Sequence, residues 1–420
     1  MGASCGRMMS SKVSSVVTVL LGALLALAAC KAAPGPGTPG PRKSRSPASS
    51  RAVAALQAGD FRAAETDAGE ALSDDHDDAQ AAAVRAIARY QGALSHLHRE
   101  VMAVIDTAGR SQGFNHGRMR AALEATTEAL ATIDTDLAVA ADDPAFALGL
   151  CLACWERDWN HSGELDDSDR LLFQIEIDAA GERIPEGDPR RKPEFRFDLG
   201  DVYWARAMVS FQRALFELIL AYRWTDLDQL VFGSTKLEKL VIRLDQPARV
   251  QLARTAILAG LTHAERSRSE YLAETDDEAE WVPNPRQRNH PLPLPADQAL
   301  YDTWGGVLGD LRRLLESKEA LHVSEIAQLG DHVWEQPPRG FVDVGLMLKK
   351  PKDVVFHLEE LDRLEDDEDI EGILASILGE YYVREGKATP LIQRLVRMKG
   401  ELERGEDSLE RKLRYLLWLN

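Results

Sequence analysis

Residues 194–224 form the most apolar segment of the chain beyond its N-terminus. The segment reads EFRFDLGDVYWARAMVSFQRALFELILAYRW, and Arg206, Arg213 and Glu217 interrupt it too often for a membrane span. A helix that is apolar on most faces belongs in the centre of a domain. We therefore expect a buried central helix here, with its aromatic side chains in the core rather than around a ligand.

Helix signals also dominate the rest of the chain. Apolar periodicity predicts helices over 118–140, 145–157, 245–274 and 297–321, and amphipathic helices in the C-terminal segments. Residues 275–296 contain five prolines and several acids, which predicts a long surface connection. Residues 340–358 have β-branched runs around a Lys-Lys-Pro-Lys-Asp turn, which predicts a small β-hairpin. The expected fold class is therefore mainly α, built of helical hairpins.

Residues 51–143 are rich in alanine. The stretch ALQAGDFRAAETDAGEAL, residues 55–72, resembles the tetratricopeptide turn, with Gly59, Phe61, Ala64 and Ala71 at its spacing. The next repeat would place its turn near Gly92, after which the period decays. The resemblance implies a repeat-like array of helical hairpins. The alternative is an alanine-rich hairpin without true repeats, and both readings are helical.

The N-terminus carries an export signal. Residues 1–12 contain Arg7 and Lys12 and no acid, and residues 13–29 are uncharged and largely apolar. The sequence Leu-Ala-Ala-Cys, ending at Cys30, resembles the lipobox of bacterial lipoprotein precursors. The resemblance implies that residues 1–29 are a lipoprotein signal peptide and that Cys30 becomes the lipidated N-terminus. The alternative is an ordinary signal peptide with a chance cysteine.

Residues 30–50 contain the lipidated cysteine and a stretch dominated by Pro, Gly and Ser, which predicts a tether that holds the body away from the bilayer. The membrane would then be one partner, through acyl chains on Cys30. Lys31 after the cysteine favours the outer membrane, facing the periplasm, although this sorting rule differs between bacterial groups. The net charge of −18 argues against nucleic acid as a partner.

Residues 157–172, RDWNHSGELDDSDRLL, have the spacing of a calcium loop. An EF-hand loop needs oxygen ligands at alternate positions, a glycine at position 6 and an acid at position 12. This stretch resembles EF-hand and dockerin-type loops, and Gly163 stands at position 6. The resemblance implies a structural calcium ion held by Asp158, Asn160, Ser162, the backbone carbonyl of Glu164, Asp166 and Asp169.

The match departs from the pattern at Asp169, where the family has a longer glutamate, and at Arg170, where an apolar residue is usual. Residues 178–188 have the position of a paired second loop, but Ala180 replaces a ligand. We expect this second loop to pack without a metal. The alternative for residues 158–169 is a metal-free, aspartate-rich turn.

Cys151 and Cys154 precede the loop with the spacing C-x-x-C. Redox sites place this motif at the start of a helix beside a βαβ unit, whereas here it falls late in a predicted helix. Two buried small residues or a local disulfide that tightens the loop are the better interpretations.

The sequence contains no H-E-x-x-H motif and no phosphate loop. Our main hypothesis is a non-catalytic, membrane-anchored lipoprotein of the cell envelope, a calcium-stabilised helical scaffold for a protein partner. The alternatives are a periplasmic ligand-binding or transporter-accessory component, with an unknown small ligand, and an enzyme of an unrecognised family. The predicted segments are 1–29, 30–50, 51–143, 144–190 with the calcium loop, and 191–420 with its long loop at 275–296.

Overall fold

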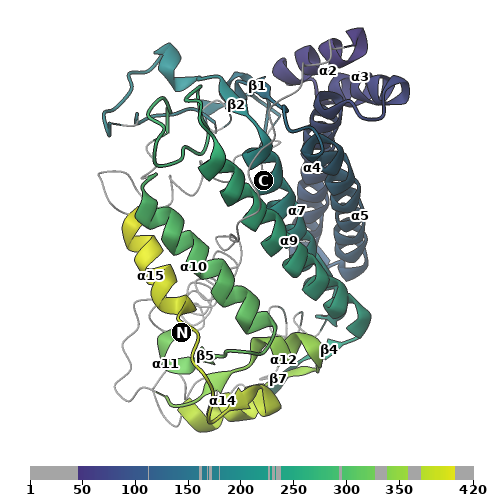
Figure 1. The fold of residues 1–420 in the computed structure, drawn as a ribbon. Coiled ribbons are helices and arrows are strands. Elements are labelled where there is room, and N and C mark those ends of the chain that lie inside the picture. Colours follow the sequence, from purple (N-terminus) through teal and green to yellow (C-terminus); the bar gives the residue numbers. More distant parts are fainter. Residues whose placement is uncertain are drawn as a thin grey trace.

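The computed structural model is mainly helical, with small antiparallel strand pairs, as the sequence predicts (Figure 1). The predicted signal peptide, Cys30, and the ligands Asn160 and Ser162 lie outside the described residues. No helix in the described parts is long and apolar enough to cross a membrane. The structure describes residues 46–111, 113–159, 163–167, 169, 173–178, 180–225, 228, 232, 238–292, 296–326, 338–357 and 370–402.

The N-terminal hairpin pairs α2 (Pro47–Gln57) with α3 (Phe61–Asp74). Gly59 turns the chain at φ +73°, a left-handed conformation that favours glycine. The Asp60 side chain then caps α3 by accepting from the Ala63 N–H. Fully buried alanines let the two helices pack closely, so the predicted hairpin is confirmed; they include Ala52, Ala64, Ala68 and Ala71.

The second predicted turn is wrong. Helix α4 (Ala79–Ser111) continues through Gly92 for many more residues before α5 (His116–Ala141) begins. A glycine inside a helix costs only about 1 kcal/mol relative to alanine, and strong helix formers surround Gly92. The repeat-like packing therefore consists of α2, α3 and the start of α4, after which two long helices follow. The predicted helix at 118–140 is confirmed as α5.

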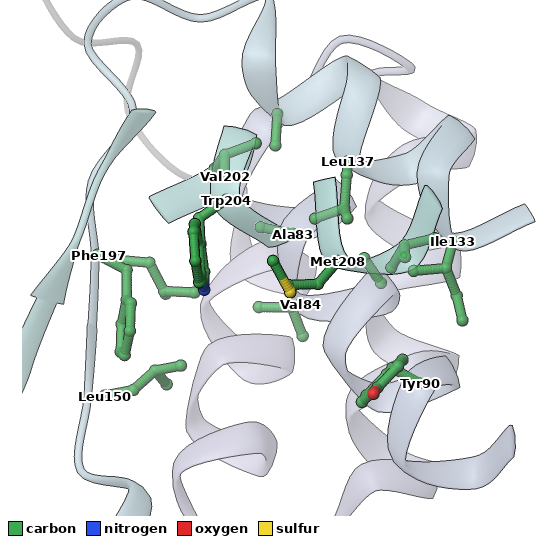
Figure 2. Close-up of a cluster of buried hydrophobic side chains, with 14 of the residues drawn as sticks. Ala83, Val84, Tyr90, Ile133, Leu137, Leu150, Phe197, Val202, Trp204 and Met208 are labelled. Atoms are coloured by element: carbon green, nitrogen blue, oxygen red, sulfur yellow. The ribbon is translucent and has the colours of Figure 1, made fainter. Parts of the chain in front are cut away.

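Helix α7 (Leu199–Ala221) lies at the centre of the molecule, between α5 and α9 (Pro247–Ala273). Figure 1 shows α4, α5, α7 and α9 running beside one another. Val202 and Met208 of α7 belong to the same hydrophobic core as Ile133 and Leu137 of α5 (Figure 2). This confirms the predicted buried central helix. One hydrophobic core joins these helices to the N-terminal hairpin.

The helix predicted over residues 145–157 is wrong. The structure has strand β1 (Leu148–Leu150) there, followed by the short 3₁₀ helix η1 (Leu152–Cys154). β1 pairs antiparallel with β2 (Phe195–Phe197), which directly precedes α7. In each strand the first and third residues are buried and the middle residue is not. This alternation in burial is that of a strand, in which successive side chains point to opposite faces.

The β-hairpin predicted over residues 340–358 is also wrong. Its two runs form β6 (Phe341–Val342) and β7 (Val354–His357), which belong to different sheets and are separated by α12 (Val344–Lys349). β7 pairs with β4 (Lys239–Leu244), which also pairs with β3 (Tyr222–Arg223). β6 lies between β5 (Leu321–His322) and β8 (Tyr382–Val383).

The C-terminal part adds α10 (Gln298–Leu315), which packs against α15 (Leu391–Leu402). Shorter elements complete the described chain: η2 (Pro189–Arg191), α11 (Val323–Ile326), α14 (Ile370–Leu378) and η4 (Gly379–Tyr381).

The connection between α9 and α10 differs from the predicted surface loop. It is irregular, but Trp281, Asn284 and Leu292 are fully buried. The Asn284 side chain donates to the backbone carbonyl of Tyr271 at 2.8 Å, which fixes the connection to the end of α9. Buried polar side chains that satisfy backbone groups allow a segment without regular structure to lie inside the fold. This connection carries residues of the acidic cluster described below.

Candidate functional site: a calcium loop and a buried acidic cluster

The predicted calcium loop turns at its glycine. Gly163 has φ +92°, and its N–H donates to Oδ2 of Asp158 at 2.8 Å. The glycine at position 6 therefore permits the sharp turn that the pattern requires. The first ligand position and the turn lie against each other.

The last predicted ligand closes the loop. Asp169 is 3 % exposed, and its Oδ1 accepts from the Trp159 N–H at 2.8 Å. Its Oδ2 accepts from the Asp166 N–H at 3.1 Å, while Oδ1 of Asp166 accepts from the Asp169 N–H at 3.2 Å. This reciprocal pairing is that of a capping box at a helix start. Position 12 of the loop is thus bonded to the backbone at positions 2 and 9.

The donor set of the loop fits a hard cation. Asp158, Asp166 and Asp169 offer carboxylate oxygens, and each oxygen has more than one lone pair, so a backbone hydrogen bond leaves acceptor capacity for an ion. Among the described residues, the groups that bring three acidic or histidine ligand atoms within 4.8 Å lie elsewhere. The calcium ligands, Glu164 included, therefore stay a prediction.

The second predicted loop is closed by its own hydrogen bonds. Oδ1 of Asp178 accepts from the N–H groups of Ala180 and Glu182, both at 3.0 Å, and Gly181 turns the chain at φ +85°. The Asp178 carboxylate also meets Arg190 at 3.4 Å. The carboxylate of Asp178 therefore has protein donors on both of its oxygens.

Aromatic rings fasten the calcium loop to the N-terminal hairpin. Trp155 packs edge-on against Phe61 of α3 with ring centroids 5.1 Å apart, and its indole Nε1 donates to the Leu56 carbonyl of α2 at 2.7 Å. Trp159 and Phe173, which flank the loop, pack against Trp155 and against each other. The loop and the hairpin therefore share one aromatic cluster.

Cys151 and Cys154 form a disulfide. Of the two interpretations left open by the sequence, the structure selects the local disulfide, which closes η1 directly before Trp155. Cys154 is exposed, so the motif is not a pair of buried small residues. The disulfide holds the chain where it enters the aromatic cluster.

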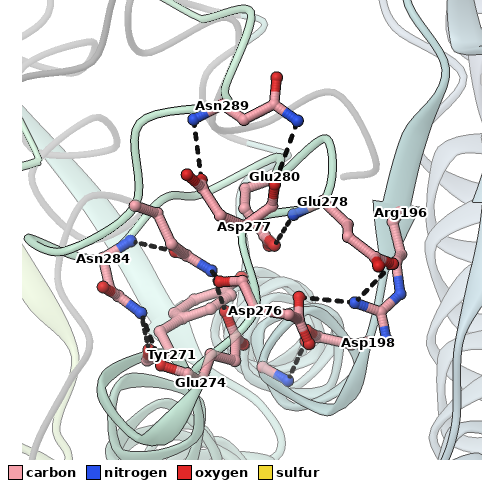
Figure 3. A network of polar contacts seen from close by, with 12 residues as sticks. Arg196, Asp198, Tyr271, Glu274, Asp276, Asp277, Glu278, Glu280, Asn284 and Asn289 are labelled. Carbon is pink, nitrogen blue, oxygen red and sulfur yellow. Dashed lines mark hydrogen bonds and ion pairs between the residues drawn. The ribbon is translucent and has the colours of Figure 1, made fainter.

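A second group of acids was missed by the sequence reasoning. The carboxylates of Asp198, Glu274 and Glu280 bring one oxygen each within 4.8 Å of one another (Figure 3). Asp198 is the N-cap of α7, Glu274 is the C-cap of α9, and Glu280 lies in the connection after α9. The helix dipole favours a negative charge at Asp198 and disfavours one at Glu274. No spacing motif links these three positions.

Further charges surround these three carboxylates. Asp201 of α7 is buried, and its Oδ1 accepts from the Tyr271 hydroxyl at 2.8 Å. Arg196 of β2 places its guanidinium 2.6 Å from Asp276 and 3.6 Å from Glu278. We call Asp198, Asp201, Glu274 and Glu280 the acidic cluster. Acids outnumber the basic groups around it.

Burial and mutual repulsion hold protons on this cluster. Burial raises the pKa of Glu274 to about 11 and that of Glu280 to about 8. Burial also raises the pKa of Asp198, and burial together with the Asp198 charge raises that of Asp201 well above its ordinary range. Carboxyl groups with raised pKa values, packed together in a folded interior, are candidates for a functional site.

A sequence match outside the predicted sites also needs a structural test. Residues 109–113 read G-R-S-Q-G, the spacing of a nucleophile elbow. That motif needs a turn from a strand into a helix, whereas Gly109 and Ser111 end the long helix α4. Nearby, His116 binds Asp228 at 2.9 Å and packs edge-on against Trp224. The His116–Asp228 pair fastens the start of α5 to the segment after α7.

An apolar cavity lies between α4, α5 and α7. Its volume is about 50 Å³, and its walls include Tyr90, Ile133, Leu137 and Phe197. Ligand pockets usually have volumes of roughly 300–1,000 Å³. This cavity is therefore a packing defect of the core rather than a ligand site.

Comparisons with known proteins give no match: no family model, no curated protein and no solved structure matches the chain.

Proposed function

We propose that the chain is a non-catalytic lipoprotein of a bacterial cell envelope, a helical scaffold whose calcium loop clamps the anchor-proximal end of the fold. The observation that carries this proposal is the contact between the loop and the N-terminal hairpin. Trp155 and Trp159 pack against Phe61, and Trp155 donates to Leu56. Helix α2 begins at Pro47, so the helical body starts within residues 30–50, which are predicted to be tether, and the tether ends earlier than predicted.

A clamp at this place has a physical role. Lipid on Cys30 would hold the tether, so any pull from the membrane would reach α2 first. The hairpin α2–α3 is short and its core is largely alanine, which buries little apolar surface per residue. An ion bound only by the folded loop stabilises the folded state by about 2.7 kcal/mol at a hundredfold excess over Kd. Because Trp155 contacts Phe61 and Leu56, an ion that stabilises the folded loop would also stabilise the packing of the hairpin against it.

The helical surface offers room for a protein partner. Met102 and Ile105 of α4 are 42 % and 51 % exposed. Residues three apart on a helix share a face, so these two side chains form an apolar contact point on a helix that is otherwise largely polar on its outer side. We take this as support for a protein partner rather than a small ligand.

Hydrogen exchange of residues 47–74, with calcium and with chelator, tests the clamp. We expect calcium to slow exchange across α2 and α3 at least tenfold in the wild type and much less in Asp158→Asn/Asp169→Asn. Both substitutions remove a charge; Asp158→Asn keeps an acceptor for the Gly163 N–H, whereas Asp169→Asn keeps an acceptor for one of the two N–H groups that Asp169 binds. Asp74→Asn/Glu186→Gln removes the same charge from exposed positions and serves as the matched control. Equal calcium effects in the loop variant and the control would refute the clamp.

Fractionation of producing cells tests the anchor. The wild type should partition with membranes and take up labelled fatty acid, and Cys30→Ala should do neither. A Cys30→Ala chain that still carries label would show that the lipobox assignment is wrong.

A further inference from the structure

The disulfide between Cys151 and Cys154 lies at the surface on one side. Cys154 is exposed, whereas Leu152 and Ala153 between the two cysteines are buried. A disulfide is cleaved when a thiolate attacks one of its sulfurs, so a thiolate can approach Cys154 without unfolding the chain. Exposed disulfides are typically the labile and regulatory ones, whereas structural disulfides resist reduction. The exposure of Cys154 therefore favours a disulfide that opens and closes in the folded protein.

The local structure removes the objection that the predicted helix raised against redox chemistry. The periodicity predicts the C-x-x-C motif late in a helix, but Cys151 directly follows strand β1 and directly precedes η1. The motif thus lies where a helical turn begins, as it does in redox sites. β1 pairs antiparallel with β2, however, so its strand pairing is not that of a βαβ unit. This combination favours a regulatory disulfide over a catalytic one.

The reduced form has an acceptor ready for one of its thiols. Sγ of Cys151 lies 3.6 Å from the backbone carbonyl oxygen of Lys192. A sulfur in a disulfide has no proton to donate, so this contact becomes a hydrogen bond only after reduction. The turn also keeps backbone hydrogen bonds of its own, from the Cys154 N–H to the Cys151 carbonyl at 3.1 Å and from the Trp155 N–H to the Leu152 carbonyl at 3.2 Å. Reduction therefore loosens the turn without unfolding it.

The residue after the disulfide holds the N-terminal hairpin. The Trp155 indole donates to the Leu56 carbonyl at 2.7 Å, and its ring packs edge-on against Phe61. Gly59, at the turn between α2 and α3, lies against the same residue, because a Cβ added there would be 3.7 Å from the Trp155 Cα. The backbone of Trp155 is fixed on its N-terminal side by the closed disulfide. A looser turn would weaken the contacts of Trp155 with both helices of the hairpin.

From this arrangement we propose that the Cys151–Cys154 disulfide is a redox switch for the attachment of the hairpin α2–α3, opened by a dithiol. A thiolate of the dithiol bonds to Sγ of Cys154, and the S–S bond breaks with its electron pair on Sγ of Cys151, which takes a proton from water. The second thiolate of the dithiol then displaces Cys154, which is protonated in turn. Two electrons pass to the protein, both cysteines become thiols, and the dithiol becomes a disulfide. This inference depends on neither the calcium ion nor the lipid.

Alkylation of the native full chain tests whether a dithiol reaches the disulfide. The chain is treated with millimolar dithiothreitol at neutral pH, with chelator and without denaturant, and then with iodoacetamide. We expect mass spectrometry to find Cys151 and Cys154 alkylated, while circular dichroism shows unchanged helix content. Reduction that occurs only in denaturant would overturn the switch.

Two single variants locate the attacked sulfur. The free Cys154 of Cys151→Ser should form a mixed disulfide with oxidised glutathione at least about tenfold faster than the free Cys151 of Cys154→Ser, because access limits the exchange. Mass spectrometry of the glutathione adduct measures both rates. Equal rates, or a faster Cys151, would contradict attack at Cys154.

Hydrogen exchange of residues 47–74 tests whether the disulfide controls the hairpin. With chelator present throughout, we expect α2 and α3 to exchange at least about fivefold faster in the reduced wild type than in the oxidised one, because local opening becomes easier. Helix α10 should exchange at the same rate in both and is the internal control. Cys151→Ser/Cys154→Ser should match the reduced wild type and show no response to dithiothreitol. Equal exchange of the hairpin in the two redox states of the wild type, a comparison that needs no substitution, would overturn the proposal.

Discussion

At the scale of single residues, the close packing of α7 against α9 limits which residue can stand at Gly200. Gly200, near the start of α7, touches Tyr271 of α9, and an added Cβ would lie 2.4 Å from Cδ1 of that ring. Gly200→Ala should lower the free energy of unfolding by about 1–3 kcal/mol, because the helices would have to separate. Gly92→Ala, where nothing lies within 4 Å, should raise it by up to about 1 kcal/mol. Urea denaturation measures the free energy of unfolding of both variants. Equal changes in Gly200→Ala and Gly92→Ala would contradict the close contact of Gly200 with Tyr271.

The acidic cluster predicts how stability depends on pH without a cation. Burial raises the pKa of Glu280 from 4.5 to about 8, so the folded chain binds a proton there that the unfolded chain releases above about pH 5. The stability that this proton contributes is fully present below the pKa of Glu280 in the unfolded chain. It is lost as pH rises through the pKa of Glu280 in the folded chain, about 8. With chelator, the melting temperature should therefore fall between about pH 5 and pH 8.

The control for this prediction is Glu280→Gln, which cannot titrate. Its melting temperature should change less over the same interval. A wild-type melting temperature that rises from pH 5 to pH 8 with chelator would contradict the assigned shift.

The alternation of acids in residues 158–169 predicts a calcium loop, which stays a prediction, while the structure shows the turn at Gly163 and the hydrogen bond from the Trp159 N–H to Asp169. The sequence could not predict the acidic cluster. Asp198 and Glu274 come together because α7 and α9 pack along their length, and no local pattern encodes that contact. The local signal available at Asp198 was a capping box with Asp201, which indicates a helix start and nothing more.

At the scale of elements, the long helices were predictable and the short strands were not. α5, α7 and α9 have sustained apolar faces, and Pro247 and Asp198 mark helix starts. β1 is only Leu-Gly-Leu, and three residues cannot distinguish a period of 2 from a helical period. Its partner β2 lies in a distant part of the sequence, so pairing rather than local preference determines β1.

The contact between the loop and α2 can be tested with one substitution. Trp155→Phe keeps an aromatic ring against Phe61 and removes the donor to the Leu56 carbonyl. We expect a loss of about 1–3 kcal/mol, because a buried acceptor at the end of α2 loses its partner. Trp159→Phe is the matched control, since its Nε1 has no acceptor among the described residues. Chemical denaturation should show the larger loss at Trp155, and the reverse order would contradict this account.

At the scale of the whole molecule, the buried connection after α9 is the main departure from the sequence reading. Prolines and acids are typical of exposed loops, but Trp281 and Leu292 enter the core. Asn284 and Gln287 satisfy each other and nearby backbone groups, with Asn284 N–H donating to Gln287 Oε1 at 2.6 Å. The connection thereby fixes α9 relative to α10 and brings Glu280 to the cluster.

The proposed arrangement gives the molecule a lipid at its N-terminus and a calcium clamp where the fold begins. Exported proteins meet high calcium, so the clamp would act as a permanent support rather than as a sensor. A scaffold that holds a partner at a membrane needs such rigidity at its anchored end.

The most direct test is the calcium dependence of the melting temperature in two chains, the wild type and Asp158→Asn/Asp169→Asn. An effect of calcium that the second chain lacks belongs to the loop. We predict that saturating calcium raises the melting temperature of the first chain by at least about 3 °C and leaves that of the second unchanged. No rise in the first chain at millimolar calcium, or an equal rise in both, would contradict the calcium clamp.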